Sequence, residues 1–327
     1  MNKFAKVMCM MAVVALTFTA CKKKEETSNA FVFHGDTEQF MVVNEDGGFE
    51  RVSIDANNRL SFDEGDKIMI FNLMKDIVGS SCVSYTVQSD GTWSPDGVMS
   101  NVTTDGNFYA FYPAQSVKVS SINFNESSHV TFNLQATQNY AADNSGNPRI
   151  PDQSLYAAAK DVTHKNLNDT WFSFKNICGI MALNLYSPMN RTVTKIEVTD
   201  NSFNLVGDVT LKIDKVDPTY MTTLFRNYSD DATYQAALAE YLDADHLGYS
   251  SVPASKTITL DCGSGVLLGR TPATAKRFLI VMRPLALLNG CNVRVYFNDG
   301  TYNDFPSTKN NMISPNVIRN FNPINVR

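Results

Sequence analysis

The sequence predicts an all-β protein of two β-sandwich domains, with one short helical insertion in the second. The first indication is the alternation of apolar and polar residues over 129–134, 203–213 and 293–297. Such alternation puts apolar side chains on one face of a strand, as in antiparallel sheets that cover a shared core. The second indication is a set of Asp-Gly and Asn-Gly pairs, which tolerate the positive φ angles of tight hairpin turns. These pairs are Asp90-Gly91, Asp96-Gly97, Asp105-Gly106, Asn289-Gly290 and Asp299-Gly300.

Several apolar runs without clean alternation are also predicted strands: 68–73, 82–87, 108–112, 180–186, 278–282 and 317–326. The polar stretch 138–152 is predicted to be a long loop. Residues 229–245 are rich in alanine, leucine and glutamate, and Ser229 or Asp230 is placed to cap a helix there. This segment is the predicted helical insertion.

The N-terminus predicts export. Lys3 and Lys6 precede an uncharged apolar run, 7–19, which is too short to span a bilayer comfortably. The run ends in Phe18-Thr19-Ala20-Cys21, which resembles a lipobox with phenylalanine where leucine is commoner. Residues 1–20 are therefore predicted to be a lipoprotein signal peptide, with Cys21 the lipidated first residue. An ordinary secretory signal with a chance cysteine is the alternative.

Residues 21–29 form a predicted polar tether. Within it, Lys24-Glu25-Glu26 looks like the surface-export signal of Bacteroidales lipoproteins, a lysine followed by two acidic residues. A generic solvated charge run is the alternative. The export signal predicts a lipid-anchored protein on the outside of the outer membrane, held there by its acyl chains.

Composition excludes some classes of protein. Loss of a signal peptide with two lysines and no acidic residue lowers the formal net charge from −5 to −7. A mildly acidic chain without a basic stripe is a poor nucleic-acid binder. With 43% apolar and 19% charged residues, the chain can fill real cores and is not disordered. Its length suits two domains, predicted at 30–165 and 166–327 because a polar stretch, 163–169, precedes a fresh strand starting at Trp171.

The sequence offers little catalytic chemistry. It contains no GxSxG, HExxH, Walker A or GxGxxG motif. Asp243 and Asp245 beside His246 could hold a metal, but the solvated end of a helix is the preferred interpretation. We therefore predict no catalytic residue, no metal site and no cofactor, and a protein that is not an enzyme.

Two residue types leave alternatives open. Four cysteines remain outside the signal peptide and the lipid site: Cys82, Cys178, Cys262 and Cys291. Their spacing in the sequence does not determine which of them would pair in disulfides. Buried free thiols are the preferred interpretation. Trp93 and Trp171 would stack on sugars if they were exposed, but core positions are preferred.

Several stretches in order resemble the fimbrillin-like (Mfa-like, type V pilin) family of Bacteroidales surface lipoproteins. The run 51–71, RVSIDANNRLSFDEGDKIMIF, has the family's aromatic position at Phe62, where tryptophan is commoner, followed by a Gly-Asp pair. The pieces Asp90-Gly91-Thr92-Trp93 and 108–113 match its "DG-x-W" and "Y-A-x-YP" patterns. Residues 172–176, followed by Gly179, resemble the strand that opens its second domain.

This resemblance implies a fimbrial subunit or accessory protein with two transthyretin-like domains, whose partners are other fimbrial subunits and the membrane. In the family, an arginine-specific protease removes an N-terminal strand, and the groove accepts a strand from the next subunit. We expect Arg51 to be the processing site, because 45–48 reads as an exposable loop. Arg59 is the alternative, as is no cleavage. The donor could be 317–326.

The second functional hypothesis is a surface lipoprotein that does not polymerise and binds a host glycan or protein. A retained lipid and an uncut N-terminus would favour it, or an anchor subunit. Loss of the residues before Val52 would favour a polymerising pilin.

Overall fold

The computed structural model describes most of the chain in separate ranges: 33–37, 41–44, 49–51, 62–73, 81–99, 107–118, 129–142, 146–151, 157–164, 170–201, 204–212, 255–283, 285–287, 290–308, 311–313 and 316–327. The signal peptide 1–20, the tether 21–29 and the predicted helix 229–245 lie outside these residues.

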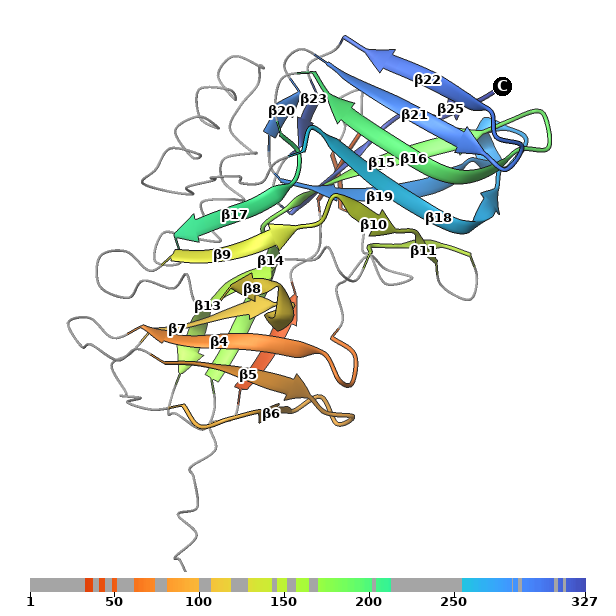
Figure 1. Ribbon diagram of the computed structural model, residues 1–327. Coiled ribbons are helices and arrows are strands. Elements are labelled where there is room, and N and C mark those ends of the chain that lie inside the picture. The colour runs from red at the N-terminus through yellow and green to blue at the C-terminus, as the bar shows by residue number, and fades with distance from the viewer. Residues whose placement is uncertain are drawn as a thin grey trace, which may run out of the picture.

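The described residues form sheets, which confirms the predicted β class (Figure 1). A seven-stranded sheet has the order β1 (Phe33–Thr37), β14 (Thr170–Asn176), β13 (Ala157–His164), β7 (Asn107–Tyr112), β4 (Lys67–Leu73), β5 (Ser81–Val87) and β6 (Trp93–Pro95). A six-stranded sheet has the order β19 (Lys276–Met282), β15 (Gly179–Tyr186), β24 (Val317–Asn320), β2 (Met41–Asn44) and β3 (Phe49–Arg51), with β25 (Ile324–Asn325) also pairing β15.

A five-stranded sheet has the order β10 (Thr137–Asn139), β18 (Thr257–Leu267), β16 (Thr192–Asp200), β21 (Cys291–Phe297) and β22 (Tyr302–Ser307). Three smaller sheets are β17 (Gly207–Lys212), β9 (His129–Leu134) and β8 (Val117–Lys118); β11 (Ala141–Ala142) and β12 (Pro148–Arg149); and β20 (Leu285–Leu287) and β23 (Asn311–Ile313). The helical turns in the described ranges are two short 3-10 turns, η1 (Ala114–Ser116) and η5 (Pro272–Thr274). None of the helical residues described here is part of a helix that could cross a bilayer.

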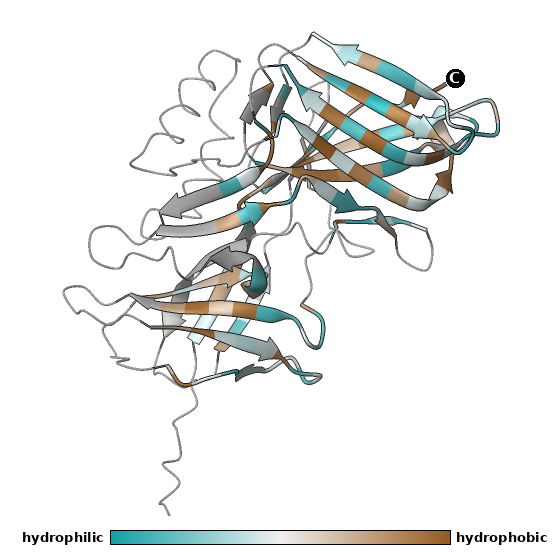
Figure 2. Ribbon diagram, viewed as in Figure 1, coloured by the Kyte–Doolittle hydropathy of each residue, from teal (hydrophilic) through white to brown (hydrophobic). Residues whose placement is uncertain are grey.

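Strands with clean alternation are covered on one face. In β21 the side chains of Cys291, Val293, Val295 and Phe297 are buried, while those between them are half-buried. Figure 2 shows the resulting bands of apolar and polar residues along β16, β18 and β21. By contrast, Ile68 to Phe71 of β4 are all buried, so both faces of that sheet are covered and no alternation is needed there.

Two hairpin turns share the sequence Asp-Gly-Thr. Gly91 and Gly300 have φ angles of 80° and 81°, in the left-handed region that favours glycine. The Asp90 carboxylate accepts bonds from the Thr92 N–H at 2.9 Å and hydroxyl at 2.6 Å, and Asp299 does the same for Thr301. These hydrogen bonds lower the pKa of both carboxyl groups.

The expected loop 138–152 is wrong in part, because β11 and β12 lie within it and β10 overlaps its start. Gln138 explains the error. Its side chain is 2% exposed, donates to the Val281 carbonyl and accepts the Val281 N–H at 2.9 Å. The sequence around Gln138 is polar and predicts a loop, because the partner that buries this side chain lies far away in the sequence.

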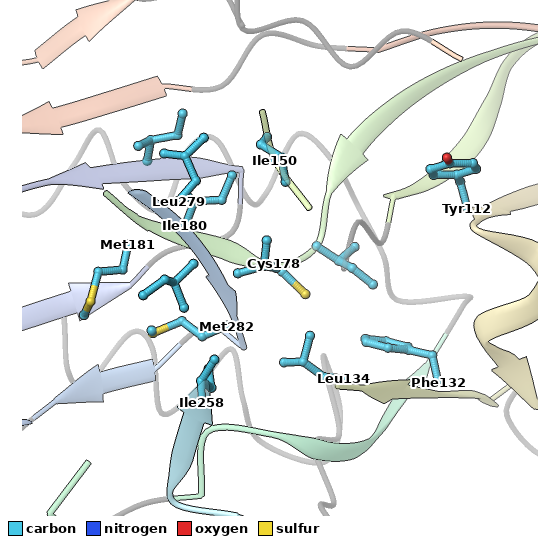
Figure 3. Packing of buried hydrophobic residues seen from close by; sticks show 14 of the residues in the cluster. Tyr112, Phe132, Leu134, Ile150, Cys178, Ile180, Met181, Ile258, Leu279 and Met282 are labelled. Atoms are coloured by element: carbon cyan, nitrogen blue, oxygen red, sulfur yellow. The ribbon is translucent and has the colours of Figure 1, made fainter. Parts of the chain in front are cut away.

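The chain passes from the seven-stranded to the six-stranded sheet between β14 and β15. The Asn176 side chain accepts the Cys178 N–H at 2.8 Å, and the Asn316 side chain accepts the Asn176 N–H at 3.2 Å. Figure 3 shows Cys178 at this junction, with Phe132 and Leu134 of β9 to one side and Ile180 to the other. The buried side chains form one continuous cluster across it. The predicted boundary at 165/166 falls before β14, although β14 pairs with first-half strands.

Candidate strand-exchange site at the N-terminal strands

The described strands that precede Arg51 occupy sheet margins. β1 is the edge strand of the seven-stranded sheet and pairs only β14 there. β2 and β3 form the outermost pair of the six-stranded sheet, where β2 contacts β24. Both contacts with the rest of the chain are parallel pairings, whereas β3 runs antiparallel to β2.

β1 is anchored by Phe33. Its side chain is fully buried, and β1 runs parallel to β14 with Phe33 opposite Thr170. The Phe33 ring meets Tyr85 edge-on at a centroid distance of 5.0 Å and lies 5.4 Å from Phe108 and 5.6 Å from Phe172. An edge strand thus places one aromatic ring in the core, the kind of burial that dominates core energetics.

Gly35, two residues on, faces the same side of the sheet. A Cβ atom there would lie 2.8 Å from ring atoms of both Phe174 and Trp93, closer than real Cβ contacts. Phe174 is fully buried and Trp93 is 5% exposed, and the Phe62 ring packs against both. Because these rings are held on several sides, they have little room to yield. This position of β1 therefore accepts only glycine without a shift of the surrounding rings.

His34 and Trp171 lie on the opposite face of the same strand pair. Their rings stack at a centroid distance of 4.6 Å and an angle of 21°, and they are register partners. Trp171 is 44% exposed, so the predicted core position is wrong for Trp171. It is confirmed for Trp93, which is buried.

β2 docks on the six-stranded sheet. Met41 pairs Val317 and Val42 pairs Ile318, and both Val42 and Ile318 are buried. Arg51 is the last residue of β3, where it is the register partner of Met41. The preceding loop 45–48 and the alternative site Arg59 lie outside the described residues.

The predicted donor segment 317–326 is built into this chain's own sheet. β24 pairs both β15 and β2, and β25 pairs β15. Ile318 and Val326 are fully buried, and the Val326 N–H donates to the Tyr186 carbonyl at 2.9 Å. A cavity of about 200 Å³ lies between this segment, β15, β21 and β22, with Leu183 and Phe305 in its wall.

The four described cysteines are free thiols. The preferred interpretation, buried free thiols, is confirmed for Cys178, Cys262 and Cys291, whereas Cys82 is only half-buried. Burial raises the pKa of Cys262 to about 12 and of Cys291 to about 11, with Asp261 and Asp200 adding to the respective shifts. Burial also raises the pKa of Cys178 and Cys82. Such thiols are poor nucleophiles near neutral pH, because the thiolate is the reactive form.

Other predicted site residues cannot be placed. Cys21, Lys24, Glu25 and Glu26 precede the first described residue. Within the described ranges, no three His, Cys, Asp or Glu side chains gather as metal ligands would. The residues that sequence reasoning missed are Phe33 and Gly35, whose only sequence signal is an aromatic residue followed two positions later by glycine.

Comparison with known proteins supports the fold. No family model and no curated protein matches this sequence. The structure is similar to that of a putative cell adhesion protein from Bacteroides ovatus over 88% of this chain and 89% of that one, with a TM-score of 0.50 and 11% identity. At that identity the likeness establishes the fold alone.

Two further solved structures match with lower TM-scores, which carry no argument by themselves. A fimbrial protein from Bacteroides ovatus matches over 91% of this chain and 50% of that one, with a TM-score of 0.43 and 11% identity. The tip fimbrial protein Mfa3 from Porphyromonas gingivalis, with C-terminal truncation, matches over 75% and 76%, with a TM-score of 0.32 and 10% identity. The structural matches are thus to putative cell adhesion and fimbrial proteins of Bacteroidales, the group that the sequence resembles.

Proposed function

We propose that this chain is a structural or adhesive subunit of cell-surface fimbriae, assembled by strand exchange after its N-terminal strands are removed. The observation that carries the proposal is the position of β1, β2 and β3. They lie at sheet margins, and β3 ends at Arg51. A cut after Arg51 therefore frees all three strands and separates no other pair of neighbours. The edges it uncovers are β14 and β24.

Uncovered edges of this kind are strong acceptors. Each presents unpaired N–H and C=O groups beside an apolar stripe, and an incoming extended segment satisfies both. Phe33 and Val42, which are buried, mark where apolar side chains would return. At roughly 1.5–3 kcal/mol for each buried side chain, these two positions contribute about 3–6 kcal/mol before any main-chain pairing. That is an upper estimate, because the free segment already buries some surface.

The chain is better suited to accept a strand than to donate its own end. Before 317–326 could serve as a donor, Ile318 and Val326 would have to leave the interior of the six-stranded sheet. The N-terminal strands, by contrast, can leave without disturbing the pairing of β15 with β24 and β25. The partners in this proposal are other fimbrial subunits.

The same proposal includes the anchoring step. A lipid on Cys21 holds the precursor in the outer membrane, and Lys24-Glu25-Glu26 directs it to the cell surface. The role is structural, without catalysis or a cofactor, and nucleic acid is not a partner.

One observation favours the second candidate, a non-polymerising surface lipoprotein that binds a glycan or a host protein. Trp171 is 44% exposed and its ring stacks on His34, so an indole lies at the surface beside the β1 edge. Exposed indoles offer an apolar ring face and an N–H donor to a ligand.

Intact mass and N-terminal peptide mapping of protein taken from the cell surface distinguish the two candidates. Strand exchange predicts a mature chain that starts at Val52. A chain that starts at acylated Cys21, with no shorter form, contradicts the proposed processing and favours an anchor subunit or the surface binder.

A further inference from the structure

We infer that the groove left by β1 selects a segment that carries an aromatic residue followed two positions later by glycine, and that this segment comes from a different kind of subunit. The inference rests on the proposed strand exchange and adds the identity of the partner. Its basis is the pair of positions that Phe33 and Gly35 occupy in the seven-stranded sheet.

The aromatic position is a socket with three ring walls. Tyr85, Phe108 and Phe172 surround Phe33 at centroid distances from 5.0 to 5.6 Å, and all four side chains are at most 2% exposed. A smaller side chain would leave part of the socket empty, and an empty volume lined by aromatic rings costs both transfer energy and packing.

The second position excludes any side chain. A Cβ atom at Gly35 would overlap Phe174 and Trp93, whose rings are themselves packed against Phe62. Phe33 and Gly35 lie on one face of β1, since side chains two residues apart in a strand point the same way. The aromatic socket at position 33 and the glycine-only position at 35 therefore constrain the same extended segment and fix its register.

This chain cannot supply such a segment once it is processed. In the full sequence, a Phe, Tyr or Trp followed two positions later by glycine occurs only at Phe33-His34-Gly35. A cut after Arg51 removes it, and the segment 309–327 contains no glycine. The occupant of this groove is therefore an extended segment of another fimbrial subunit, and the processed chain alone does not fill it.

The test begins from the folded full-length chain. A recognition sequence for a site-specific protease is inserted between Asn44 and Phe49, and the chain is cut after folding. The fragment that carries β1 then stays bound without a covalent link. A fluorescently labelled peptide of residues 30–39 is added in mild urea, which speeds exchange, and its binding is followed by fluorescence polarisation. The uncut chain is the control and should bind no peptide.

Peptide variants then examine the two positions. Phe33→Ala should weaken binding by more than about a hundredfold, because it empties the socket. Gly35→Ala should weaken it by about five- to a hundredfold through overpacking. His34→Phe, which changes the ring on the opposite face, is the matched control and should bind within about threefold of the natural peptide. A peptide of residues 316–327 should not compete.

The outcomes distinguish failure of this inference from failure of the proposed strand exchange. Binding of the natural peptide with loss on Phe33→Ala and Gly35→Ala supports the inference. Equal binding of the natural and Gly35→Ala peptides, or competition by the 316–327 peptide, overturns the inference and leaves strand exchange standing. If the cut chain takes up no peptide at all, strand exchange at β14 is wrong, and the inference is rejected with it.

Discussion

Replacing Phe33 by alanine examines whether β1 is a true part of the folded precursor. The ring is fully buried and touches three other rings. Core Phe→Ala changes cost about 3–5 kcal/mol, as the sum of lost transfer energy and the cavity that remains. Because β1 is an edge strand, a mutant can also release the whole strand, so the loss cannot exceed the docking free energy of β1. We expect a loss of about 3 kcal/mol, near the lower end of that range.

Urea unfolding of the full-length chain measures this loss, with the midpoint and slope fitted for each transition. Val98→Ala is the control, since Val98 is 79% exposed and should change the stability by less than about 0.5 kcal/mol. Hydrogen exchange at β14 adds a local readout, because its edge amides lose protection if β1 leaves. A loss below about 1 kcal/mol for Phe33→Ala, with unchanged protection of β14, would show that β1 contributes nothing to the precursor and refute the reasoning.

Three other results are expected. Gly35→Ala should destabilise the full-length chain by about 1–3 kcal/mol in thermal unfolding, because the new methyl group would overlap buried rings. Gly97→Ala is the control: a Cβ atom there would lie 3.8 Å from its nearest neighbour, so the stability should change by less than about 0.5 kcal/mol. Equal effects of the two substitutions would contradict the packing argument. Hydrogen bonds from Arg294 hold the pKa of Asp304 below its usual value, so the stabilisation is present above about pH 4 and is lost as the pH falls through the folded-state pKa. The difference in melting temperature between wild type and Asp304→Asn should therefore shrink at low pH. A difference that grows as the pH falls would contradict a lowered pKa of Asp304 in the folded state. All four described cysteines should react with iodoacetamide after denaturation without reductant, as seen by peptide mass, and an unreactive pair would reveal a disulfide.

Much of the β architecture is predictable because it is local. The alternation in β21 follows from one covered face, and the Asp-Gly-Thr turns carry their own hydrogen bonds between neighbouring residues. The sequence therefore contains enough information to find these strands and turns without knowledge of their partners.

What could not be predicted depends on partners far along the chain. Gln138 is a strand residue because β10 pairs with β18, and its buried side chain bonds Val281 of β19. β14 joins the first sheet because β1 and β13 flank it. Trp171 is half-exposed although tryptophan is usually buried. Successive side chains of a strand point to opposite faces, and in β14 the neighbouring Phe172 occupies the buried face. Within the candidate site, the roles of Phe33 and Gly35 were missed for the same reason. Nothing near Gly35 in sequence indicates that Trp93 and Phe174 lie above it.

The N-terminal strands are held by contacts that are distant in sequence. Met41 pairs Val317 near the other end of the chain, and Phe33 pairs Thr170, both in parallel ladders. Contacts so distant in sequence must overcome a large loop-closure entropy and tend to form late in folding. We therefore expect the sheets that receive β1 and β2 to be largely assembled before these strands dock. Under the proposed strand exchange, a framework that takes up its own margin strands last would take up an equivalent segment from another subunit by the same energetics.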